Sequence, residues 1–193
     1  MEKFRSIFEE LDVKENMEDI FKEKATELIN NFIIVANSKT YRLGEIEFYL
    51  FEDGKHNDTF IHAIIKEGKP SNFAANRQCH LGEWYFHYSG IDIAIGDGKN
   101  RYGGILIRSL ISDKVTNKKD LIGPLKIKNH LLNDYKGIDA SEQFIKLKYD
   151  PSAEDVTIYP RPRVGLGKSG NNYYRKMNYR FVHEAINNIV KES

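Results

Sequence analysis

The sequence contains a single cysteine, Cys79, and six scattered histidines among its 193 residues. One thiol cannot form an intrachain disulfide, and the dispersed histidines do not match the clustered ligand spacing of a zinc site. We therefore predict a protein of a reducing compartment that uses neither a metal nor another cofactor.

Long apolar segments are also missing. No stretch approaches the roughly 20 apolar residues that a membrane-spanning helix needs. The N-terminal segment Met1–Leu11 mixes acidic with apolar side chains, unlike the continuous apolar core of a signal peptide. The sequence thus predicts a cytoplasmic protein with no membrane segment. With 40% hydrophobic residues, a chain of this length can bury one core, so we expect a single domain over residues 1–193.

An excess of charge of one sign is absent as well, because the formal net charge is +1. This balance argues weakly against a nucleic-acid partner, whose phosphates require clustered Lys and Arg. The charges are nevertheless segregated along the chain. Residues 1–31 contain nine acidic and five basic residues, whereas residues 156–183 contain six basic and no acidic residues. The C-terminal part is therefore compatible with binding nucleic acid.

Hydrophobic periodicity predicts an α+β domain. Apolar residues at helical spacing within residues 1–30 predict an N-terminal helical extension. Apolar and alternating segments predict a sheet of at least four strands, from Phe32–Val35, Tyr41–Phe51, Trp84–Tyr88, Ile91–Ile95 and Gly103–Arg108. Further expected elements are a turn at 37–39, a helix from Pro124, short strands at Phe144–Leu147 and Val156–Tyr159, and a closing helix whose stripe runs from Val182 to Val190.

Two carboxylates are candidates for acid–base chemistry. Glu45 and Glu47 lie two residues apart in a predicted strand, so their side chains share a face with Leu43 and Tyr49. In a pocket, burial would raise the pKa of such a carboxyl group into a useful range. The alternative is that both side chains are solvated, as most glutamates are.

The segment 51–83 is too long for a plain connection and is a candidate functional loop. Its His56, Asp58 and His62 are residue types that bind metals, but their spacing matches no zinc signature. The alternative is a histidine that makes one hydrogen bond or, for His62, an aromatic face in a pocket.

The glycine-rich run 165–170 (GLGKSG) lacks the spacing of a nucleotide-binding P-loop. Lys168 and the backbone amides around it are still candidates to hold a nucleic-acid phosphate. After this run, tyrosines interleave with arginines in the manner of base stacking plus charge: Tyr173, Tyr174, Arg175, Tyr179 and Arg180. The alternative is a flexible, solvated surface loop.

Six short motifs follow one another between residues 27 and 182. They are Glu45–Leu50 (EIEFYL), Asp58–Ala63 (DTFIHA), Trp84–Phe86 with Gly90, Leu106–Arg108 (LIR), Gly123–Ile127 (GPLKI) and Arg163–Gly167 (RVGLG). In this order they resemble the alkyladenine (3-methyladenine) DNA glycosylase family, whose members excise damaged purines from a flipped nucleotide.

The resemblance implies a single domain with a curved, mostly antiparallel sheet, flanking helices and a pocket for one extruded base. It implies a monofunctional hydrolase of base-excision DNA repair that removes an alkylated or deaminated purine. By position, Glu47 matches the family's water-activating base and Arg108 an active-site arginine. Tyr49, His62 and Phe86 match the aromatic residues that sandwich the base.

The remaining site residues and the partner follow from the same resemblance. We expect a monomer that binds DNA and is associated with the nucleoid. Arg163, Lys168 and Arg175 are expected to contact the nucleic-acid backbone, and Tyr88 to contact the base.

The chain departs from the family at three places. Ser89 replaces the tyrosine that the family uses as a wedge, and Gly96 replaces an asparagine. The family's Arg-Asn loop is not clearly reproduced in the segment that contains Asn72, Asn76 and Arg77. Two alternatives therefore stay open: a non-catalytic nucleic-acid or modified-base binding protein of this fold, and a hydrolase of free nucleosides.

Overall fold

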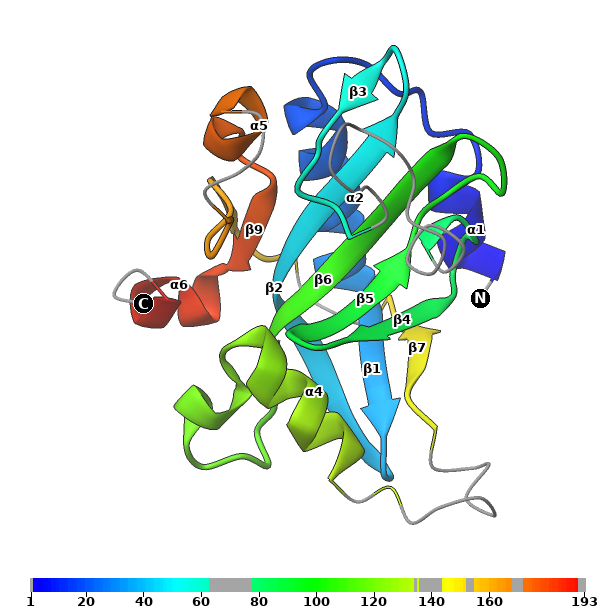
Figure 1. The fold of residues 1–193 in the computed structure, drawn as a ribbon. Helices are drawn as coiled ribbons and strands as arrows, with labels where there is room; N and C mark the ends of the chain where they lie inside the picture. Colours follow the sequence, from blue (N-terminus) through cyan, green and yellow to red (C-terminus); the bar gives the residue numbers. More distant parts are fainter. Residues whose placement is uncertain are drawn as a thin grey trace.

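The computed structural model of the protein describes residues 2–62, 78–133, 135, 144–151, 155–167 and 172–190. Within these residues nine strands form one curled sheet, and every strand pair is antiparallel (Figure 1). The strands are β1 (Phe32–Ala36), β2 (Lys39–Glu52), β3 (His56–Asn57), β4 (Trp84–His87), β5 (Gly90–Ala94), β6 (Arg101–Ile111), β7 (Lys146–Tyr149), β8 (Ile158–Arg161) and β9 (Arg180–His183).

Strand β2 is the centre of the sheet. The main path runs β4-β5-β6-β2-β1-β7, and β2 also pairs with β3 and β9. The hairpin from β1 to β2 turns at Asn37 and Ser38, whose φ angles are 52° and 60°. Two residues with positive φ match the right-handed twist of the flanking strands, so this tight turn fixes the register. The predicted turn is confirmed.

A β-bulge divides β2 into two parts. The register to β6 shifts on both sides of Glu45. An extra residue in one strand reverses the alternation of its side chains, and Leu43 and Ile46 consequently both face the hydrophobic core. The expectation that Leu43 shares a face with Glu45 and Glu47 is therefore wrong, whereas the two carboxylates do lie on one side, against Arg108.

The N-terminal helices α1 (Glu2–Phe8) and α2 (Glu18–Asn31) pack against the core face of β2, and Figure 1 shows α2 behind the sheet. Phe21 of α2 stacks on Phe48 with ring centroids 4.4 Å apart. Phe48 and its neighbours two residues away point to the opposite side from Glu47. Residues 2–30 therefore contribute to the common core and lie away from the candidate site.

The other helices are η2 (Lys118–Leu121), α4 (Pro124–Leu132), α5 (Asn172–Lys176) and α6 (Glu184–Val190). Helix α4 packs on β5 and β6 and begins at Pro124 as predicted, since proline suits a first helical position. The closing helix begins only at Glu184, because Val182 belongs to β9 and pairs with β2 and β8. The short strands β7 and β8 each start two residues later than expected.

The predicted fold class is confirmed: the protein is a single α+β domain with a curled antiparallel sheet and flanking helices. Among the described residues, no helix combines the length and the apolar character required to cross a membrane.

The backbone packs too tightly at Gly96 for any side chain. A Cβ atom there would lie 2.4 Å from the backbone of Cys79. This contact explains why an asparagine cannot occupy the position, and it generates a test. We expect Gly96→Ala to lower the free energy of unfolding by about 3 kcal/mol, the upper end for overpacking, because backbone cannot move aside as a side chain can. Urea denaturation measures this change.

Gly98→Ala is the matched control for that variant. Its Cβ would meet no neighbouring atom, and only its φ of 78° opposes a side chain, which costs about 1–2 kcal/mol. Equal losses of stability in the two variants would contradict the proposed contact with Cys79.

Candidate active site

A cavity of about 430 Å³ lies on the Glu47 side of the sheet. Its walls come from β2, β4, β5, β6, the start of α4 and two loops. The lining residues are Tyr49, Phe60, His62, His87, Ser89, Asp92, Leu106, Arg108, Pro124 and Val164–Gly167. We call it the Glu47 cavity, because three of the residues that line it also hold the Glu47 carboxylate.

Glu47 is fully buried beneath the floor of this cavity. The Tyr49 hydroxyl donates a hydrogen bond of 2.6 Å to its Oε2. The backbone N–H of Val164 donates one of 3.1 Å to Oε1, and Arg108 Nε lies 3.4 Å from the same oxygen. All three partners line the cavity, so the carboxylate lies one layer below its surface.

Burial raises the pKa of Glu47 above 4.5. The cation of Arg108 and the hydrogen bonds from Tyr49 and Val164 oppose this effect but do not cancel it. Burial together with the Glu47 charge raises the pKa of Tyr49 well above 10.0, which keeps its hydroxyl a hydrogen-bond donor. The site therefore contains a carboxyl group that is more basic than a surface glutamate.

Glu45 has a different environment on the same strand. Its Oε1 accepts hydrogen bonds from Arg108 Nε at 3.1 Å and from Arg180 at 3.0 Å, and Ser109 donates one of 2.7 Å to Oε2. Two guanidinium groups thus share this buried carboxylate. Glu45 is an ion-pair partner that orients Arg108 toward Glu47, and it lines an adjoining hollow, whereas Glu47 lies under the floor of the Glu47 cavity.

Arg163 is buried and does not face a DNA backbone, which corrects its predicted role. Its guanidinium forms a 2.6 Å ion pair with Asp58, and neither side chain is exposed. It also donates hydrogen bonds to the carbonyls of Phe48 and Tyr174, and its plane lies 4.5 Å over the ring of Tyr49. Arg163 consequently connects its own loop with β2, α5 and the loop after β3, behind the cavity.

Arg175 holds the glycine-rich loop. Its guanidinium donates to the carbonyls of Leu166 and Gly167 and lies 4.9 Å over the ring of Phe60. These contacts give the half-buried Arg175 a structural role, and its contact with a nucleic-acid backbone stays a prediction. Lys168, the third predicted backbone residue, lies outside the described residues, as do Ala63, Asn72, Asn76 and Arg77.

The tyrosines around this loop are mostly core residues. Tyr174 and Tyr179 are buried, and Arg180 is bonded to Glu45. The interpretation of these three residues as an exposed stacking surface is therefore wrong. Tyr173, 40% exposed, lies at the surface as expected.

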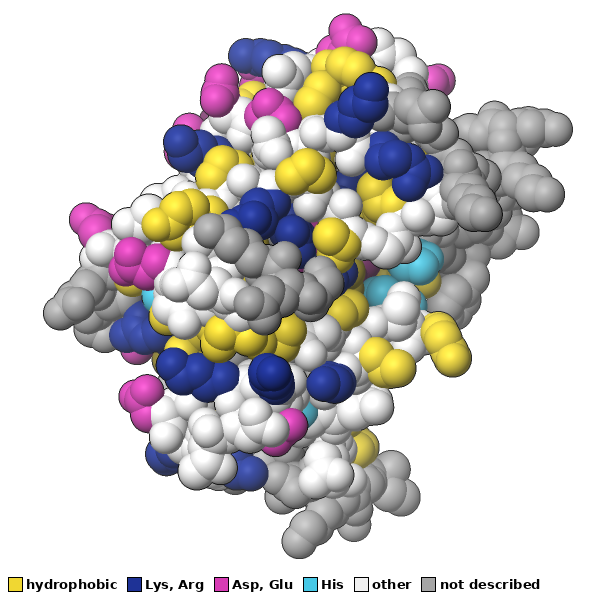
Figure 2. All heavy atoms as spheres, turned by 90° about the vertical axis from the view of Figure 1, so that its left-hand side faces the viewer, with side chains coloured by type: hydrophobic (Ala, Val, Ile, Leu, Met, Phe, Trp, Pro, Cys, Tyr) yellow, Lys and Arg dark blue, Asp and Glu magenta, His cyan; other side chains and the backbone are white. Residues whose placement is uncertain are grey.

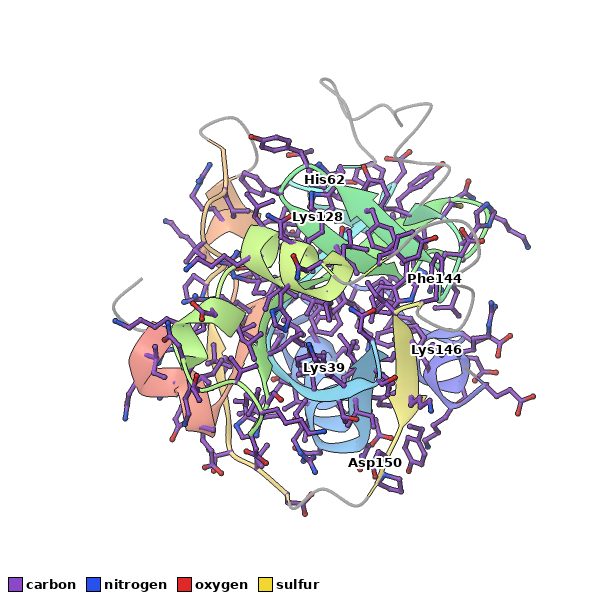
Figure 3. All side chains as sticks on the ribbon, turned by 90° about the horizontal axis from the view of Figure 1, so that it is seen from below. Lys39, His62, Lys128, Phe144, Lys146 and Asp150 are labelled. Atoms are coloured by element: carbon purple, nitrogen blue, oxygen red, sulfur yellow. The ribbon has the colours of Figure 1, made fainter. Side chains whose placement is uncertain are left out.

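Flat rings form the wall of the cavity opposite β2. His62 lies 4.4 Å from His87 and 6.0 Å from Tyr85 between ring centroids, and Tyr85 stacks on His87 at 5.4 Å. His62 and Lys128 lie together beside the green strands, far from Asp150 on the other side of the molecule (Figure 3). Burial and the neighbouring His87 lower the pKa of His62 below 6.5, which favours the neutral imidazole.

Phe86 faces away from this wall, which corrects its predicted place in the base clamp. Side chains alternate along β4. His87 lines the cavity, with the buried Tyr85 stacked on its ring, whereas Phe86 packs on the core and borders another hollow, which His87 also reaches. The resemblance located the right strand but the wrong face. Since every second residue shares a face, a shift of one position decides the outcome.

Asp92, Gln78 and Gly104 were missed by the sequence interpretation. Asp92 is 2% exposed and accepts hydrogen bonds from His87 Nε2 at 3.2 Å and from Gln78 at 2.9 Å. A Cβ at Gly104 would lie 2.9 Å from the Asp92 carboxylate, so glycine leaves room for it. One signal was available, namely a charged residue in the otherwise apolar strand Gly90–Ala94.

Tyr88 lies at the tip of the β4–β5 hairpin and is 90% exposed. Its carbonyl and that of His87 each accept a 2.8 Å hydrogen bond from Lys128 of α4, which fixes the hairpin tip. Ser89, the next residue, lines the cavity. The structure therefore brings Tyr88 to the rim of the Glu47 cavity but not into it.

The three candidate metal-binding residues do not converge. His56 bonds to the Leu50 carbonyl and the Tyr179 hydroxyl, Asp58 is paired with Arg163, and His62 stacks in the cavity. In the part of the chain that the structure describes, no three His, Cys, Asp or Glu side chains are grouped to hold a metal ion.

A second hollow, of about 570 Å³, adjoins the Glu47 cavity and shares Arg108, Val164 and Gly165 with it. Lys119 and Lys126 line its outer part near the start of α4. Figure 2 shows Lys and Arg side chains spread across one face of the molecule, with most Asp and Glu toward its edge. Sequence interpretation missed these two lysines because it placed the basic face in residues 156–183.

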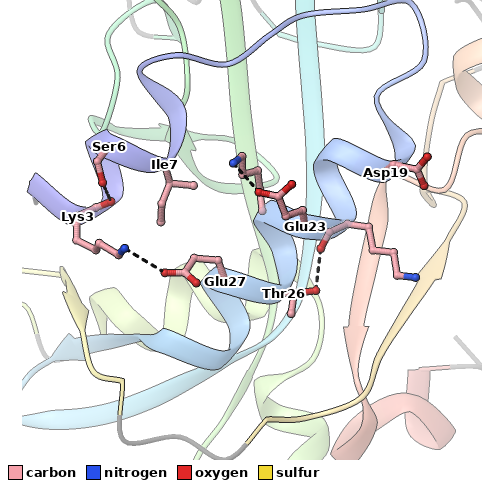
Figure 4. A pocket seen from close by; sticks show the side chains of 9 residues that line it. Lys3, Ser6, Ile7, Asp19, Glu23, Thr26 and Glu27 are labelled. Atoms are coloured by element: carbon pink, nitrogen blue, oxygen red, sulfur yellow. Dashed lines mark hydrogen bonds and ion pairs between the residues drawn. The ribbon is translucent and has the colours of Figure 1, made fainter.

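A hollow of about 670 Å³ lies between α1 and α2 and differs in character (Figure 4). Its charges neutralise one another locally, as in the pairs Lys3–Glu27 at 3.7 Å and Lys24–Glu23 at 2.9 Å. It contains no predicted site residue. The Glu47 cavity is therefore the candidate active site.

No protein-family model matches the chain. An uncharacterized protein of Acanthamoeba polyphaga mimivirus is 28% identical over 198 residues, an alignment that covers 90% of this chain and 90% of the viral protein. The similarity thus extends over nearly the whole length of both proteins, and it assigns no activity.

Removing the charge of Asp58 tests the structural role of Arg163. We expect Asp58→Asn to lower the free energy of unfolding by about 3–5 kcal/mol, because it leaves a buried guanidinium without its counter-charge. Chemical denaturation followed by circular dichroism measures the loss. Asp53→Asn, at an exposed position, should change stability by less than about 0.5 kcal/mol. Similar stabilities for both variants would refute the structural role.

Proposed function

We propose that the protein is an N-glycosylase that removes a damaged purine from DNA, with Glu47 as the base that activates water. One observation supports this most strongly: a fully buried carboxylate lies under the floor of a cavity whose opposite wall consists of flat rings. The ordered motifs that resemble the alkyladenine DNA glycosylase family support the same activity.

The chemistry requires a carboxylate at this place. Cleavage of an N-glycosidic bond develops positive charge on the sugar, and a nearby carboxylate stabilises that charge. The same group takes a proton from the attacking water. Glu47 suits both tasks, because burial raises its pKa and makes it a better base, while the Arg108 cation favours its ionised form.

The cavity also suits a single base. Its volume of about 430 Å³ is within the ordinary range for small-ligand sites. An extruded base between Tyr49 on one side and His62 and His87 on the other would stack on rings, which contributes about 1–3 kcal/mol and tolerates varied purines. We include His87 in the clamp in place of Phe86, with the buried Tyr85 stacked on its ring.

DNA is the expected partner. The exposed ring of Tyr88 beside the cavity has the position of a side chain that fills the gap left by a flipped nucleotide. Lys119 and Lys126 lie where the flanking phosphates would pass. As a base-excision repair enzyme the protein would act as a monomer on chromosomal DNA in the cytoplasm.

A second candidate function is recognition of a modified base without cleavage. The Glu47 carboxylate has no exposed area and already accepts two hydrogen bonds. A binding protein could use the same cavity and rings with this carboxylate as a purely structural acceptor. The two functions differ in whether Glu47 must be charged.

Glu47→Gln tests the proposed function. Wild type should produce alkali-sensitive sites in single- or double-stranded oligonucleotides that contain hypoxanthine, ethenoadenine or 3-methyladenine. We expect Glu47→Gln to reduce the cleavage rate at least about 100-fold, because the amide cannot accept the proton of water, while base binding is retained.

The control is Glu83→Gln at an exposed position, which should cleave as wild type does. Binding of modified DNA without cleavage by wild type would instead establish the binding protein. Cleavage of free nucleosides alone would move the substrate away from DNA.

The pH dependence of cleavage tests the environment of Glu47. Activity needs the carboxylate form, so kcat/KM should rise with pH, and its midpoint should lie above 4.5 because burial raises the pKa. The Arg108 cation lowers this pKa, so Arg108→Gln should move the midpoint to higher pH. Single-turnover rates measured from about pH 4 to 8 give the midpoints of wild type and of Arg108→Gln. An unmoved midpoint in Arg108→Gln would contradict the assignment.

A further inference from the structure

A row of cross-strand neighbours connects Glu47 to a second buried carboxylate. Glu47 of β2 is opposite Leu106 of β6, and Leu106 is opposite Asp92 of β5. Directly opposed residues share a face of the sheet. Since neighbouring strands are about 4.8 Å apart, Glu47 and Asp92 stand on the order of 10 Å apart, with Leu106 on the cavity floor between them. The two carboxylates therefore mark opposite ends of the same floor.

Asp92 faces the cavity as a hydrogen-bond acceptor. Its side chain is buried, its Oδ2 accepts a 2.9 Å hydrogen bond from Gln78, and its Oδ1 lies 3.2 Å from His87 Nε2. A carboxylate can accept about four hydrogen bonds and has no donor of its own. Because Asp92 also lines the Glu47 cavity, its remaining acceptor positions are available to a ligand there.

The polar groups of the cavity are unevenly distributed along its floor. At one end, the Arg108 guanidinium, the Tyr49 hydroxyl and the Val164 N–H surround the buried Glu47 as donors. At the other end lies Asp92, which carries the one carboxylate among the described residues that line the cavity. A ligand that spans the floor and satisfies this end must present an N–H group to Asp92.

The direction of the floor determines which edge of a purine meets Asp92. The proposed reaction requires the bond between the sugar and the purine to lie near Glu47. The long axis of the base then runs across Leu106 toward β5, while the rings of His62 and His87 pack on its face. The edge that reaches Asp92 is therefore the one farthest from the sugar, which carries N1 and the substituent on C6.

We propose that Asp92 determines the specificity of the cavity, and that the substrates are purines with an N–H donor on this far edge. Hypoxanthine meets the requirement through its N1–H, and 3-methyladenine through its amino group. Ethenoadenine does not, because its additional ring blocks both positions and leaves no N–H there. The assignment rests on the proposed glycosylase function and narrows the substrate class of the same cavity.

The discrimination follows from the cost of an unpaired acceptor. A site that is built to hydrogen-bond an N–H group rejects an analogue that lacks it, because its buried polar group loses water and gains no partner. The nitrogen lone pairs of ethenoadenine would also face the oxygens of Asp92. Asparagine at this position has nearly the same size but adds an N–H donor, so Asp92→Asn changes the preference and not the room for the base.

Hypoxanthine and ethenoadenine are both neutral bases and allow a direct test in single-turnover cleavage of oligonucleotides, with each rate divided by the spontaneous rate of loss of that base. We expect wild type to favour hypoxanthine about 100-fold or more. Asp92→Asn should lower hypoxanthine release about 10-fold or more and leave ethenoadenine release unchanged or faster. Asp113→Asn, at an exposed position, should keep the wild-type ratio of the two rates.

The outcomes separate the two proposals. Equal losses on both bases in Asp92→Asn, or wild type that releases ethenoadenine as fast as hypoxanthine, would overturn the role of Asp92 while leaving the glycosylase intact. Release of 3-methyladenine without hypoxanthine would also overturn it. Wild type that releases none of the three bases would overturn the glycosylase itself. Because the wild-type ratio requires no substitution, a ratio near one contradicts the role of Asp92 even if Asp92→Asn does not fold.

Discussion

The ion pair between Arg163 and Asp58 is the interaction on which both the fold and the site depend. A buried guanidinium is stable only when its charge and most of its donors are satisfied. Arg163 achieves this with Asp58, two backbone carbonyls and the ring of Tyr49. The pair thereby joins the loop after β3, β2 and α5. It also places the next residue, Val164, with its N–H on Glu47, so the loop that closes the cavity and the carboxylate beneath it are fixed by one contact.

The two glutamates of β2 show how one strand supports opposite uses of the same chemical group. The bulge at Glu45 brings this carboxylate between Arg108 and Arg180, where it is neutralised. Glu47 has one close cation, Arg108 at 3.4 Å, the weaker influence of the Arg163 charge, and otherwise neutral hydrogen-bond donors. Glu45, shared by two guanidinium groups, stabilises the fold. The negative charge of Glu47 is less fully offset by cations, so burial still raises its pKa, and a raised pKa is one that catalysis can use. The asymmetry arises from the bulge, not from the residue type.

Local sequence patterns predicted the elements well and the orientations poorly. The hairpin at Asn37 and Ser38, the strands from Phe32 to Ile111 and the start of α4 follow from turn chemistry and periodicity. The alternation of side chains predicts that Phe86 and His87 point to opposite faces of the sheet. It does not predict which of these faces borders the cavity. The fate of Arg163 depends on Asp58, which is 105 residues away in the chain, and no local pattern distinguishes an arginine that binds phosphate from one that is buried against a distant carboxylate.

The alternation of side chains along β4 also gives the cavity two chemically different walls. On the β2 side, Tyr49, Glu47 and Arg108 form a connected group of charge and donors beneath the floor. On the β4 side, His62 and His87 present rings, with Tyr85 stacked on His87, and His87 is hydrogen-bonded to Asp92. Had Phe86 faced the cavity, that wall would have been apolar and able only to stack. With His87 there, a ligand held between the walls meets an ionisable group on each side, and Leu106 lies between Glu47 and Asp92 in the cross-strand register.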